Sequence, residues 1–481
     1  MLLYKRQNKI KHTRRDALMD IIIQQIVEKI IKSTNENLEM ILKERKGISD
    51  FIIEIKKTLD EIGVDIVSLV LEEMDERVKD DINRKQAWIV KSKNNEKSLG
   101  TIFGEVKYKR TYYENKKTGG YKYLSDEMLG LQAHDKIDTS LKSKIIDEAI
   151  DSPYRKSGSK ASENLKLTGQ TVMNSIRELG PVENNEIPVK DKKKKVKKLY
   201  IEADEDHVAL QSGKCIEPKL VYVHEGKKKV SKDRYKLLNK RVFSGVYKES
   251  EDLWLEVADY LYEAYDIDKI EKIYLSGDGA NWIKQGLGWI KNSEYVLDRF
   301  HLSKYVRQGT AHLPNITDSL WNYINRLEKK NVKDLFSAIL EETEKETKKE
   351  SVRDARRYII NNWEGIENQY NYDYIGCSAE GHVSHILSDR LSSRPLGWSR
   401  EGVDQMSRLR AFKTNGGNVY KLFNKRRQAQ LKEERILKLS KRNISKKVIS
   451  KTADKVIDNI PVLSDGRTTG LSKVLKSFRG A

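Results

Sequence analysis

One short stretch constrains the fold of this chain more than any other, because it joins an apolar strand pattern to a dense group of acids. Residues 199–208 read LYIEADEDHV, and a run of lysines precedes them over 192–198. Clustered carboxylates repel each other, so they cost folding free energy unless a partner neutralises them. A divalent cation would remove that cost, and the neighbouring lysines favour a phosphate-bearing substrate. The alternative is a solvated strand end, since exposed acidic residues are the rule.

The acidic strand opens a segment in which strand and helix patterns alternate. The predicted elements are strands at 199–203, 219–224 and 241–247, a helix at 251–265, a strand at 272–276, a helix at 282–290 and a strand at 295–297. The short connections between the first three strands favour an antiparallel meander. The whole order is that of an RNase H-like fold, in which the first and fourth strands lie side by side. Asp204 and Asp278, at the ends of those strands, would then converge.

Asp204, Asp278 and Glu380 are the candidate catalytic and metal-binding residues, with Glu380 near the start of a predicted helix that reaches Arg390. Two Mg²⁺ ions held by such carboxylates would activate a nucleophile and stabilise a leaving oxygen, and Mn²⁺ would substitute for them. Asp206 remains an alternative to Asp204, because strand alternation puts both side chains on one face.

The remaining chain divides by periodicity and charge, which predicts a multidomain fold of α plus α/β class. The predicted segments are a helical N-terminal arm at 1–95, a β-hairpin module at 96–137, a helix-turn-helix-like unit at 138–180, a basic linker at 181–198, the first part of the mixed-sheet core at 199–301, an all-α insertion at 302–372, the last part of the core at 373–415 and a basic tail at 416–481. Apolar residues recur every four positions in the arm, so it is expected to pack on itself or on a second subunit.

Two segments ahead of the core suggest contact with DNA. The predicted hairpin has a strand over 102–113 and a return at 121–124, and its alternating Lys, Arg and Tyr suit a DNA backbone or an ordinary exposed hairpin equally. In the helix-turn-helix-like unit, a helix at 141–150, a basic flexible connection at 154–160 and a short helix at 161–165 precede a glycine-bearing turn and a last helix at 171–179. Three-helix units also occur without any role in DNA binding. The candidate DNA contacts are Arg155, Lys156, Lys160, Gln170, Asn174 and Arg177.

The overall charge points to a polyanionic partner. Lys and Arg total 92 against 72 acids in 481 residues, a net charge of +20 that is spread along the chain. Nucleic acid is a simpler partner for such a chain than a membrane surface. No apolar run approaches the roughly 18 residues that span a bilayer, and the N-terminus lacks a signal-peptide core. Two cysteines make no disulfide framework, so the expected location is cytoplasmic and nucleoid-associated.

Several short motifs together carry a resemblance to a known family. They are IEADEDHV at 201–208, SGDGA at 276–280, LDRFH at 297–301, SAEGH at 378–382, Arg390 and RPLGWS at 394–399. With them, the chain resembles the bacterial ISLre-type insertion-sequence transposases, from the hairpin near Gly104 onward. The resemblance implies an RNase H-like DDE core, Mg²⁺-dependent DNA cleavage and strand transfer, and Asp204, Asp278 and Glu380 as metal ligands. A catalytically silent DNA-binding derivative and a metal-dependent nuclease are the alternatives.

The motif from Asp298 to His301 is similar to the Asp/Cys-x-x-His signature of Mutator-like transposases, as is the helical interruption before Glu380. This likeness makes Asp298 and His301 accessory candidates, with His301 positioning DNA or a flipped base, or serving only the structure. Arg390 and Arg394 join the DNA-binding candidates. The implied partners are transposon ends and target DNA, and synapsis of two ends implies a homodimer or a larger assembly.

Overall fold

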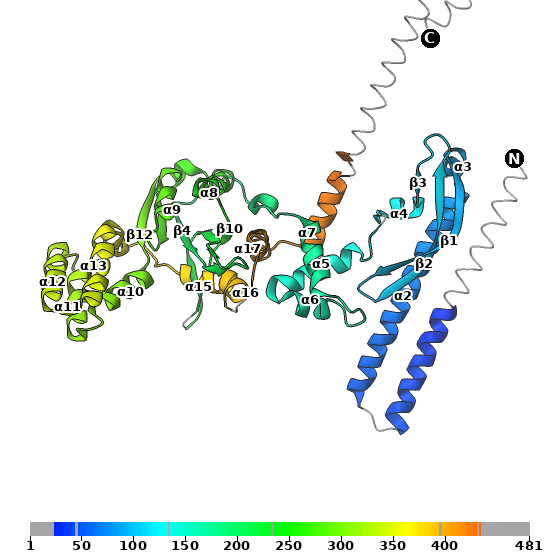
Figure 1. The fold of residues 1–481 in the computed structure, drawn as a ribbon, viewed down its shortest axis with the longest axis horizontal. Helices are drawn as coiled ribbons and strands as arrows, with labels where there is room; N and C mark the ends of the chain where they lie inside the picture. The colour runs from blue at the N-terminus through cyan, green and yellow to red at the C-terminus, as the bar shows by residue number, and fades with distance from the viewer. Residues whose placement is uncertain are drawn as a thin grey trace, which may run out of the picture. The chain divides into compact units, whose positions relative to one another are not determined.

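The computed structural model describes residues 24–43, 47–132, 134–232, 234–393, 397–430 and 432–433. The chain divides into two units, Met1–Asn418 and Val419–Ala481, and the first contains the sheet and the candidate acids (Figure 1). Its fold mixes helices with sheets, and the largest sheet has five strands of mixed direction.

The central sheet matches the predicted strand order. Its strands are β4 (Lys198–Glu205), β7 (Lys219–His224), β10 (Arg241–Gly245), β11 (Lys272–Gly277) and β12 (Ser293–Leu297). They lie in the order β10-β7-β4-β11-β12. β7 is antiparallel to both β4 and β10, whereas β11 is parallel to β4 and β12. The meander and the pairing of the first and fourth strands are therefore confirmed.

Strand alternation gives β4 two different faces. Leu199, Ile201 and Ala203 belong to the main apolar core, which also includes Leu253 and Trp254 of α8 (Ser250–Ala264). On the opposite face Tyr200 stacks on Tyr274 of β11. Because side chains alternate along a strand, Glu202 and Asp204 share this second face with Tyr200.

A block of helices follows β12, as predicted for residues 302–372. It comprises α10 (Arg299–Thr310), α11 (Thr317–Asn325), α12 (Lys329–Glu342), α13 (Glu346–Asn361) and α14 (Trp363–Glu367). α13 packs on both α10 and α12, and α14 packs on β12. Val306, Phe336 and Ile359 are fully buried between these helices and continue the core of the sheet.

The chain then returns to the sheet in a broken helix. It consists of α15 (Ala379–Val383), a π-helical turn at Ser384–Ser388 and α16 (Asp389–Leu391), followed by α17 (Arg400–Thr414). α15 contacts β4 and α17 contacts β10. The helix predicted around Glu380 and the one predicted at 401–412 are both present. A π-turn is rare and occurs frequently at functional sites.

The N-terminal arm forms a helical pair followed by a three-stranded sheet. Residues 24–43 form a helix that contacts α2 (Ile48–Asp80). Lys29 Nζ in this helix donates a hydrogen bond to Asp65 Oδ2 of α2 at 2.9 Å. The expected packing of the arm on itself is confirmed in this part. α3 (Ile82–Ala87) leads into β1 (Trp88–Gly100), which pairs with β2 (Glu105–Asn115) beside β3 (Tyr121–Lys122).

The predicted boundary at residue 95 is wrong, because β1 already begins at Trp88. The helix pattern gives no warning of this change, since β1 is largely polar. Its pairing with β2 runs along the whole strand from Trp88 opposite Asn115 to Gly100 opposite Glu105. Such long-range pairing overrides local preference.

Residues 138–180 form three helices, α5 (Thr139–Asp151), α6 (Tyr154–Ala161) and α7 (Gly169–Leu179). The segment predicted as a flexible connection is α6, and residues 162–165, predicted as helical, lie outside any helix. Gly158 misled the prediction. Its role is close packing inside α6, since an added Cβ would lie 2.7 Å from the Leu167 carbonyl oxygen.

Candidate functional site

Two of the candidate acids meet at one edge of the central sheet. In the parallel pair of β4 and β11, Glu202 is opposite Ser276, so Asp204 and Asp278 follow at matching positions near the carboxyl ends of the two strands. Asp204 is 7% exposed and Asp278 is half-buried. Ligand sites of sheets with parallel strands form at this edge.

Glu380 approaches from the broken helix. It lies in the first turn of α15, its side chain is exposed, and α15 packs on β4. Burial is the main cause that raises the pKa of Asp204 to about 7, and the charges of Asp278 and Glu380 raise it further. The three predicted site residues are therefore within electrostatic reach of one another.

Asp298 and His301 lie beside these acids. Asp298 follows β12 and caps α10, accepting a hydrogen bond from Phe300 N at 3.1 Å. His301 Nδ1 is 3.4 Å from Asp298 Oδ2, which is close enough for an ion pair. The two atoms are not aligned for a hydrogen bond. Burial opposes a charged imidazole, but Asp298, Asp204 and Asp278 raise the pKa of His301 above its usual value. The predicted accessory pair thus belongs to the same cluster of charges.

Asp206 has a different environment from Asp204. It lies just beyond β4, where its Oδ1 accepts hydrogen bonds from Ser392 Oγ at 2.9 Å and from His207 N at 3.0 Å. Its Oδ2 is buried and has no hydrogen-bond partner among the described residues. The local contacts of Asp206 are with the end of the broken helix, whereas Asp204 faces Asp278 and Glu380.

The candidate acids lie near one another, but they do not form a preorganised metal site. Within the described ranges, no group of three or more His, Cys, Asp or Glu side chains is close enough to hold a metal ion. The donor set nevertheless fits Mg²⁺ or Mn²⁺, since carboxylate oxygens are their preferred protein ligands. Glu205 N and the charge of His301 compensate the Asp204 carboxylate in part, but burial still raises its pKa, and a bound cation would lower it.

Glu202 is a buried acid whose role the sequence prediction did not identify. It is 1% exposed, and its carboxylate accepts hydrogen bonds from Tyr222 Oη and from Ser378 N. Ser378 Oγ donates to the same oxygen at 3.1 Å, and His224 Nε2 lies 3.0 Å from the other. His224 Nδ1 lies 3.3 Å from both the backbone nitrogen and the carbonyl oxygen of Gly226, which fixes the ring beside the carboxylate.

These bonds attach the start of α15 to the middle of β4, two residues before Glu380. Burial disfavours the charge of Glu202, but the hydrogen bonds, chiefly from His224, lower its pKa to about 2. One sequence signal was available. A glutamate inside a strand that is buried on both sides must find donors, because an unpaired buried charge is too costly to keep.

Comparison with known proteins places the chain in a family. The model of an uncharacterised protein family, UPF0236, matches residues 41–428. The chain belongs to UPF0236. A UPF0236 protein of Caldanaerobacter subterraneus subsp. tengcongensis is 41% identical over 96% of this chain and 98% of its own length. Its name joins eleven gene designations.

Two further UPF0236 proteins show how far the similarity extends. A second protein from the same organism, whose name joins four gene designations, is 41% identical over 95% of this chain and 97% of its own length. A UPF0236 protein in the vanSb 3' region of Streptococcus gallolyticus is 26% identical over 78% of this chain and 85% of its own length.

The candidate DNA contacts of this UPF0236 chain lie on α6 and α7. Gln170, Asn174 and Arg177 are exposed at spacings of four and three residues, so they share one face of α7. Gln170 Nε2 donates to Asn174 Oδ1 at 2.9 Å. Arg155 and Lys156 are exposed on α6. Lys160 is exposed on α6 as well, although its Nζ donates to Ser152 Oγ at 3.1 Å.

Arg390 departs from its predicted role. It is 4% exposed, its Nε donates to Ala149 O at 3.0 Å, and its guanidinium stacks on Tyr154 and Trp398. The side chain thus joins α16 to the three-helix unit, and its burial argues against the predicted DNA contact. Arg394 lies outside the described residues.

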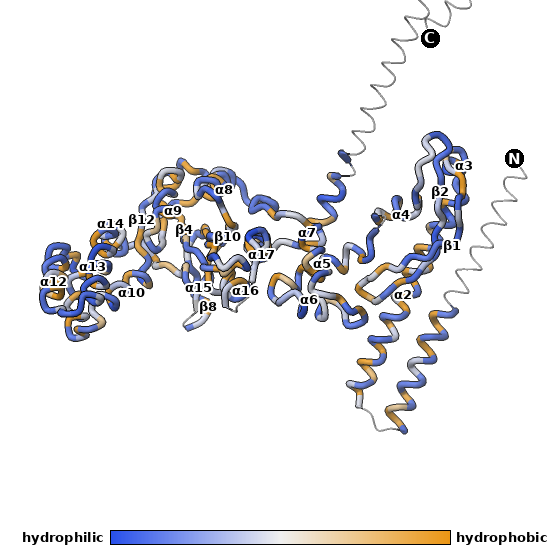
Figure 2. The backbone as a smooth tube through the Cα atoms, viewed as in Figure 1, coloured by the Kyte–Doolittle hydropathy of each residue, from blue (hydrophilic) through white to orange (hydrophobic). Residues whose placement is uncertain are grey.

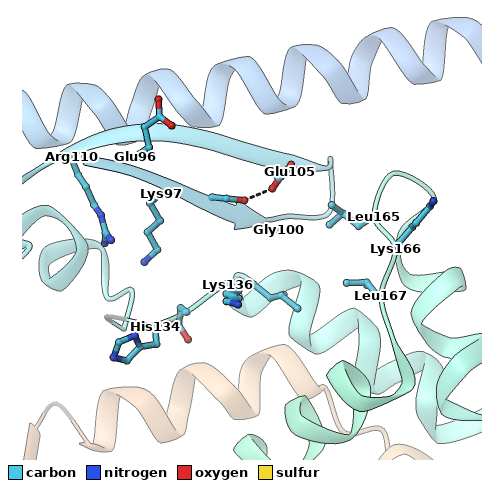
Figure 3. A pocket seen from close by; sticks show the side chains of 13 residues that line it. Glu96, Lys97, Gly100, Glu105, Arg110, His134, Lys136, Leu165, Lys166 and Leu167 are labelled. Carbon is cyan, nitrogen blue, oxygen red and sulfur yellow. Dashed lines mark hydrogen bonds between the residues drawn. The ribbon is translucent and has the colours of Figure 1, made fainter. Parts of the chain in front are cut away.

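A pocket of about 590 Å³ lies away from the candidate residues Asp204, Asp278 and Glu380 (Figure 3). Lys97 and Arg110 line it, together with His134 and Lys136. Both cations pair with buried Asp126, at 3.1 Å for Lys97 Nζ, so their charges are already compensated. None of the predicted site residues lines this pocket.

In the part of the UPF0236 chain that the structure describes, no helix has the length and apolar character needed to cross a membrane.

Proposed function

We propose that this chain is a DDE-type transposase of the ISLre type, which cleaves insertion-sequence DNA ends and transfers the strands in a Mg²⁺-dependent reaction. The observation that carries the proposal is the meeting of Asp204 and Asp278 at one sheet edge, with the charge of Glu380 within reach. Acids brought together from distant parts of a chain destabilise it. A perturbed cluster of this kind therefore favours a functional site over a structural one.

The arrangement of the central sheet supports an RNase H-like core. Counted along the chain, its strands lie in the order third, second, first, fourth, fifth, and the second runs in the opposite direction to the other four. The candidate acids follow the first and fourth strands. Glu380 lies on a helix that comes after the all-α block, as the resemblance to Mutator-like transposases leads us to expect.

The names of the relatives add independent support. One UPF0236 protein carries eleven gene designations from a single organism, and another carries four. Several gene copies of the same protein in one organism are what a mobile element leaves behind. A housekeeping enzyme gives no reason for such multiplication.

Each residue of the proposed site has a distinct task. Asp204, Asp278 and Glu380 would hold the ions, and the bonds between Glu202 and Ser378 would keep Glu380 at the sheet edge. Mg²⁺, when bound there, would activate the attacking hydroxyl and stabilise the leaving oxygen. A positively charged His301 would balance the carboxylates, since its charge lowers the pKa of Asp204.

DNA recognition is assigned to the three-helix unit. We place a helix-turn-helix role on α6 and α7, with Gln170, Asn174 and Arg177 facing the major groove. The exposed cations of α6 would contact phosphates and set the register of the protein on DNA. The net charge of +20 provides the long-range attraction, and the protein would act in the cytoplasm on the nucleoid.

The N-terminal arm is the proposed dimer interface. Ile52, Leu59 and Ile66 recur every seven residues on α2, and all three are exposed. Figure 2 shows hydrophobic stretches alternating with hydrophilic ones along this helix and residues 24–43. A seven-residue apolar repeat is the pattern through which helices of two copies pack, so the arm supports a homodimer or a larger synaptic assembly.

The proposal is tested by replacing Asp278 with Asn and assaying strand cleavage and joining in Mg²⁺ or Mn²⁺. Both reactions should fall below detection while folding and DNA binding persist, because only a proposed metal ligand changes. Asp268→Asn is the matched control, since Asp268 is exposed on the same core and should be replaceable without loss. Wild-type activity in Asp278→Asn removes that residue from the mechanism. Cutting without joining by the wild-type protein identifies a nuclease, and neither reaction identifies a silent DNA-binding protein.

A further inference from the structure

A second hairpin interrupts the meander between β7 and β10. It consists of β8 (Lys227–Ser231) and β9 (Arg234–Leu237), which pair as antiparallel strands. The sequence predicts the flanking strands at 219–224 and 241–247 but no element between them. Residues 227–237 read KKKVSKDRYKL, with six basic residues and one acid.

Four lysines of this hairpin are exposed to solvent. Lys228, Lys229, Lys232 and Lys236 are all exposed, and none has an ion-pair partner among the described residues. In the register of the strands, Lys228 lies directly opposite Lys236. Like charges at directly opposed positions destabilise a strand pair, and a lone two-stranded hairpin is marginally stable already. The sequence thus retains a repulsion that a polyanion would relieve.

The base of the hairpin is attached to the segment that carries Glu380. Lys227 Nζ donates hydrogen bonds to Gly376 O at 2.8 Å and to Ile375 O at 3.2 Å. Two residues further on, Ser378 bonds to Glu202. The base of the hairpin is therefore anchored four residues before Glu380 in the chain. It lies at the Tyr200 end of β4, because Tyr200 is opposite His224 in the strand register.

We infer that the β8–β9 hairpin binds the phosphate backbone of DNA. The inference rests on the proposed function for the choice of DNA as the polyanion. Lysine ammonium groups attract phosphates without reading bases, so the contact holds the strand irrespective of its sequence. Tyr235, exposed and opposite Lys229, adds an aromatic face on which an unpaired base can stack. The alternative is that these lysines only protect a sheet edge, and DNA affinity would then not depend on them.

The test measures binding of the full-length chain to a fluorescent DNA duplex of arbitrary sequence over a range of salt. The hairpin variant carries Lys228→Gln, Lys229→Gln and Lys236→Gln. Three lost phosphate contacts should make the slope of log affinity against log salt shallower by about 2 to 3, since each contributes about 0.9. Affinity at low salt should fall at least about tenfold. An unchanged slope overturns the inference.

A matched variant distinguishes an effect of the hairpin's lysines from an effect of the lower net charge. Lys330→Gln, Lys333→Gln and Lys348→Gln remove the same charge from exposed positions of the helical block, which has no such hairpin. An equal loss of affinity in this control also overturns the inference. Replacing the three hairpin lysines by Arg should restore binding. The thermal stability of the Gln variant should match or exceed that of the wild type, because the repulsion between Lys228 and Lys236 is gone.

The outcome is independent of whether the chain transposes DNA. Binding is measured without catalysis, so Asp278→Asn should show the same dependence on the hairpin lysines as the wild type. Loss of hairpin-dependent binding with intact strand transfer refutes only the hairpin. Absence of strand transfer with hairpin-dependent binding refutes only the proposed reaction.

Discussion

The two faces of β4 show how one strand can stabilise a fold and also carry a strained cluster. On one face Leu199, Ile201 and Ala203 are fully buried in the core. On the other, Glu202 is surrounded by donors, whereas Asp204 is buried near His301 and two further acids. Burying an aliphatic side chain contributes about 1.5 to 3 kcal/mol, whereas a buried carboxylate without compensation costs stability.

The polar face itself contains two solutions to the burial of an acid. Glu202 has a lowered pKa because hydrogen bonds stabilise its charge, whereas burial and neighbouring acids raise the pKa of Asp204 to about 7. Two residues apart on the same strand, the protein stabilises the charge of one acid and disfavours the charge of the other. This contrast supports a structural role for Glu202 and the proposed site role for Asp204.

The largest expected effect comes from Asp204→Asn, which should abolish strand cleavage while leaving the protein as stable as the wild type or more stable. An acid whose folded pKa exceeds its unfolded value of about 3.9 binds its proton more tightly when folded. In metal-free protein, the stability due to Asp204 is therefore greatest below about pH 4 and declines as the pH rises through 7. The variant lacks this decline.

Urea unfolding at several pH values, compared between the wild type and Asp204→Asn, measures that difference. The gap in unfolding free energy should widen in favour of the variant from pH 4 to pH 7, and added Mg²⁺ should narrow it. Equal pH profiles would mean that Asp204 is compensated within the protein, which would erase its contrast with Glu202.

The apolar face should respond in the opposite sense. Ile201→Ala removes buried methyl groups from the core and should lower the unfolding free energy by about 2 to 5 kcal/mol at every pH. Ile201→Val, a smaller truncation at the same site, should cost about 0.5 to 1.5 kcal/mol. Denaturant midpoints check both values. If Ile201→Ala lowers the unfolding free energy by less than Ile201→Val does, the apolar face of β4 is not the stabilising one.

Glu202→Gln should lower the unfolding free energy by about 1 to 3 kcal/mol, because the amide nitrogen would meet hydrogen-bond donors. Strand-transfer rates should fall further than stability predicts, since α15 loses its attachment to β4, while DNA affinity stays unchanged. Single-turnover rates at saturating DNA, with unfolding curves as the control, separate the two effects. Wild-type rates would show that Glu202 does not position Glu380.

The core sheet could be predicted from the sequence, but several other features could not. Buried strands such as 272–276 stand out as short apolar runs, and the brief links between the early strands limit the topologies available. β1 and the β8–β9 hairpin are polar, so their strands are visible only through the partner strand. α6 was missed because Gly158 suggests flexibility until its contact with Leu167 is known.

The site followed the same division. Asp204 and Asp278 were predictable because they end strands that pair, and strand order alone fixes where they meet. The contribution of Glu202 was hidden, since its partners His224 and Ser378 lie far along the chain. The burial of Arg390 was equally invisible, because its partners belong to the three-helix unit.

The hydrogen bonds between Glu202 and Ser378 join residues 176 positions apart without any covalent link. The all-α block leaves the sheet after β12 and returns just ahead of this junction, so both of its attachment points are fixed. Lengthening such an excursion costs little, about 0.6 kcal/mol for each doubling of its length. We expect relatives to vary the length of this block while keeping α10, which carries His301 into the cluster of charges.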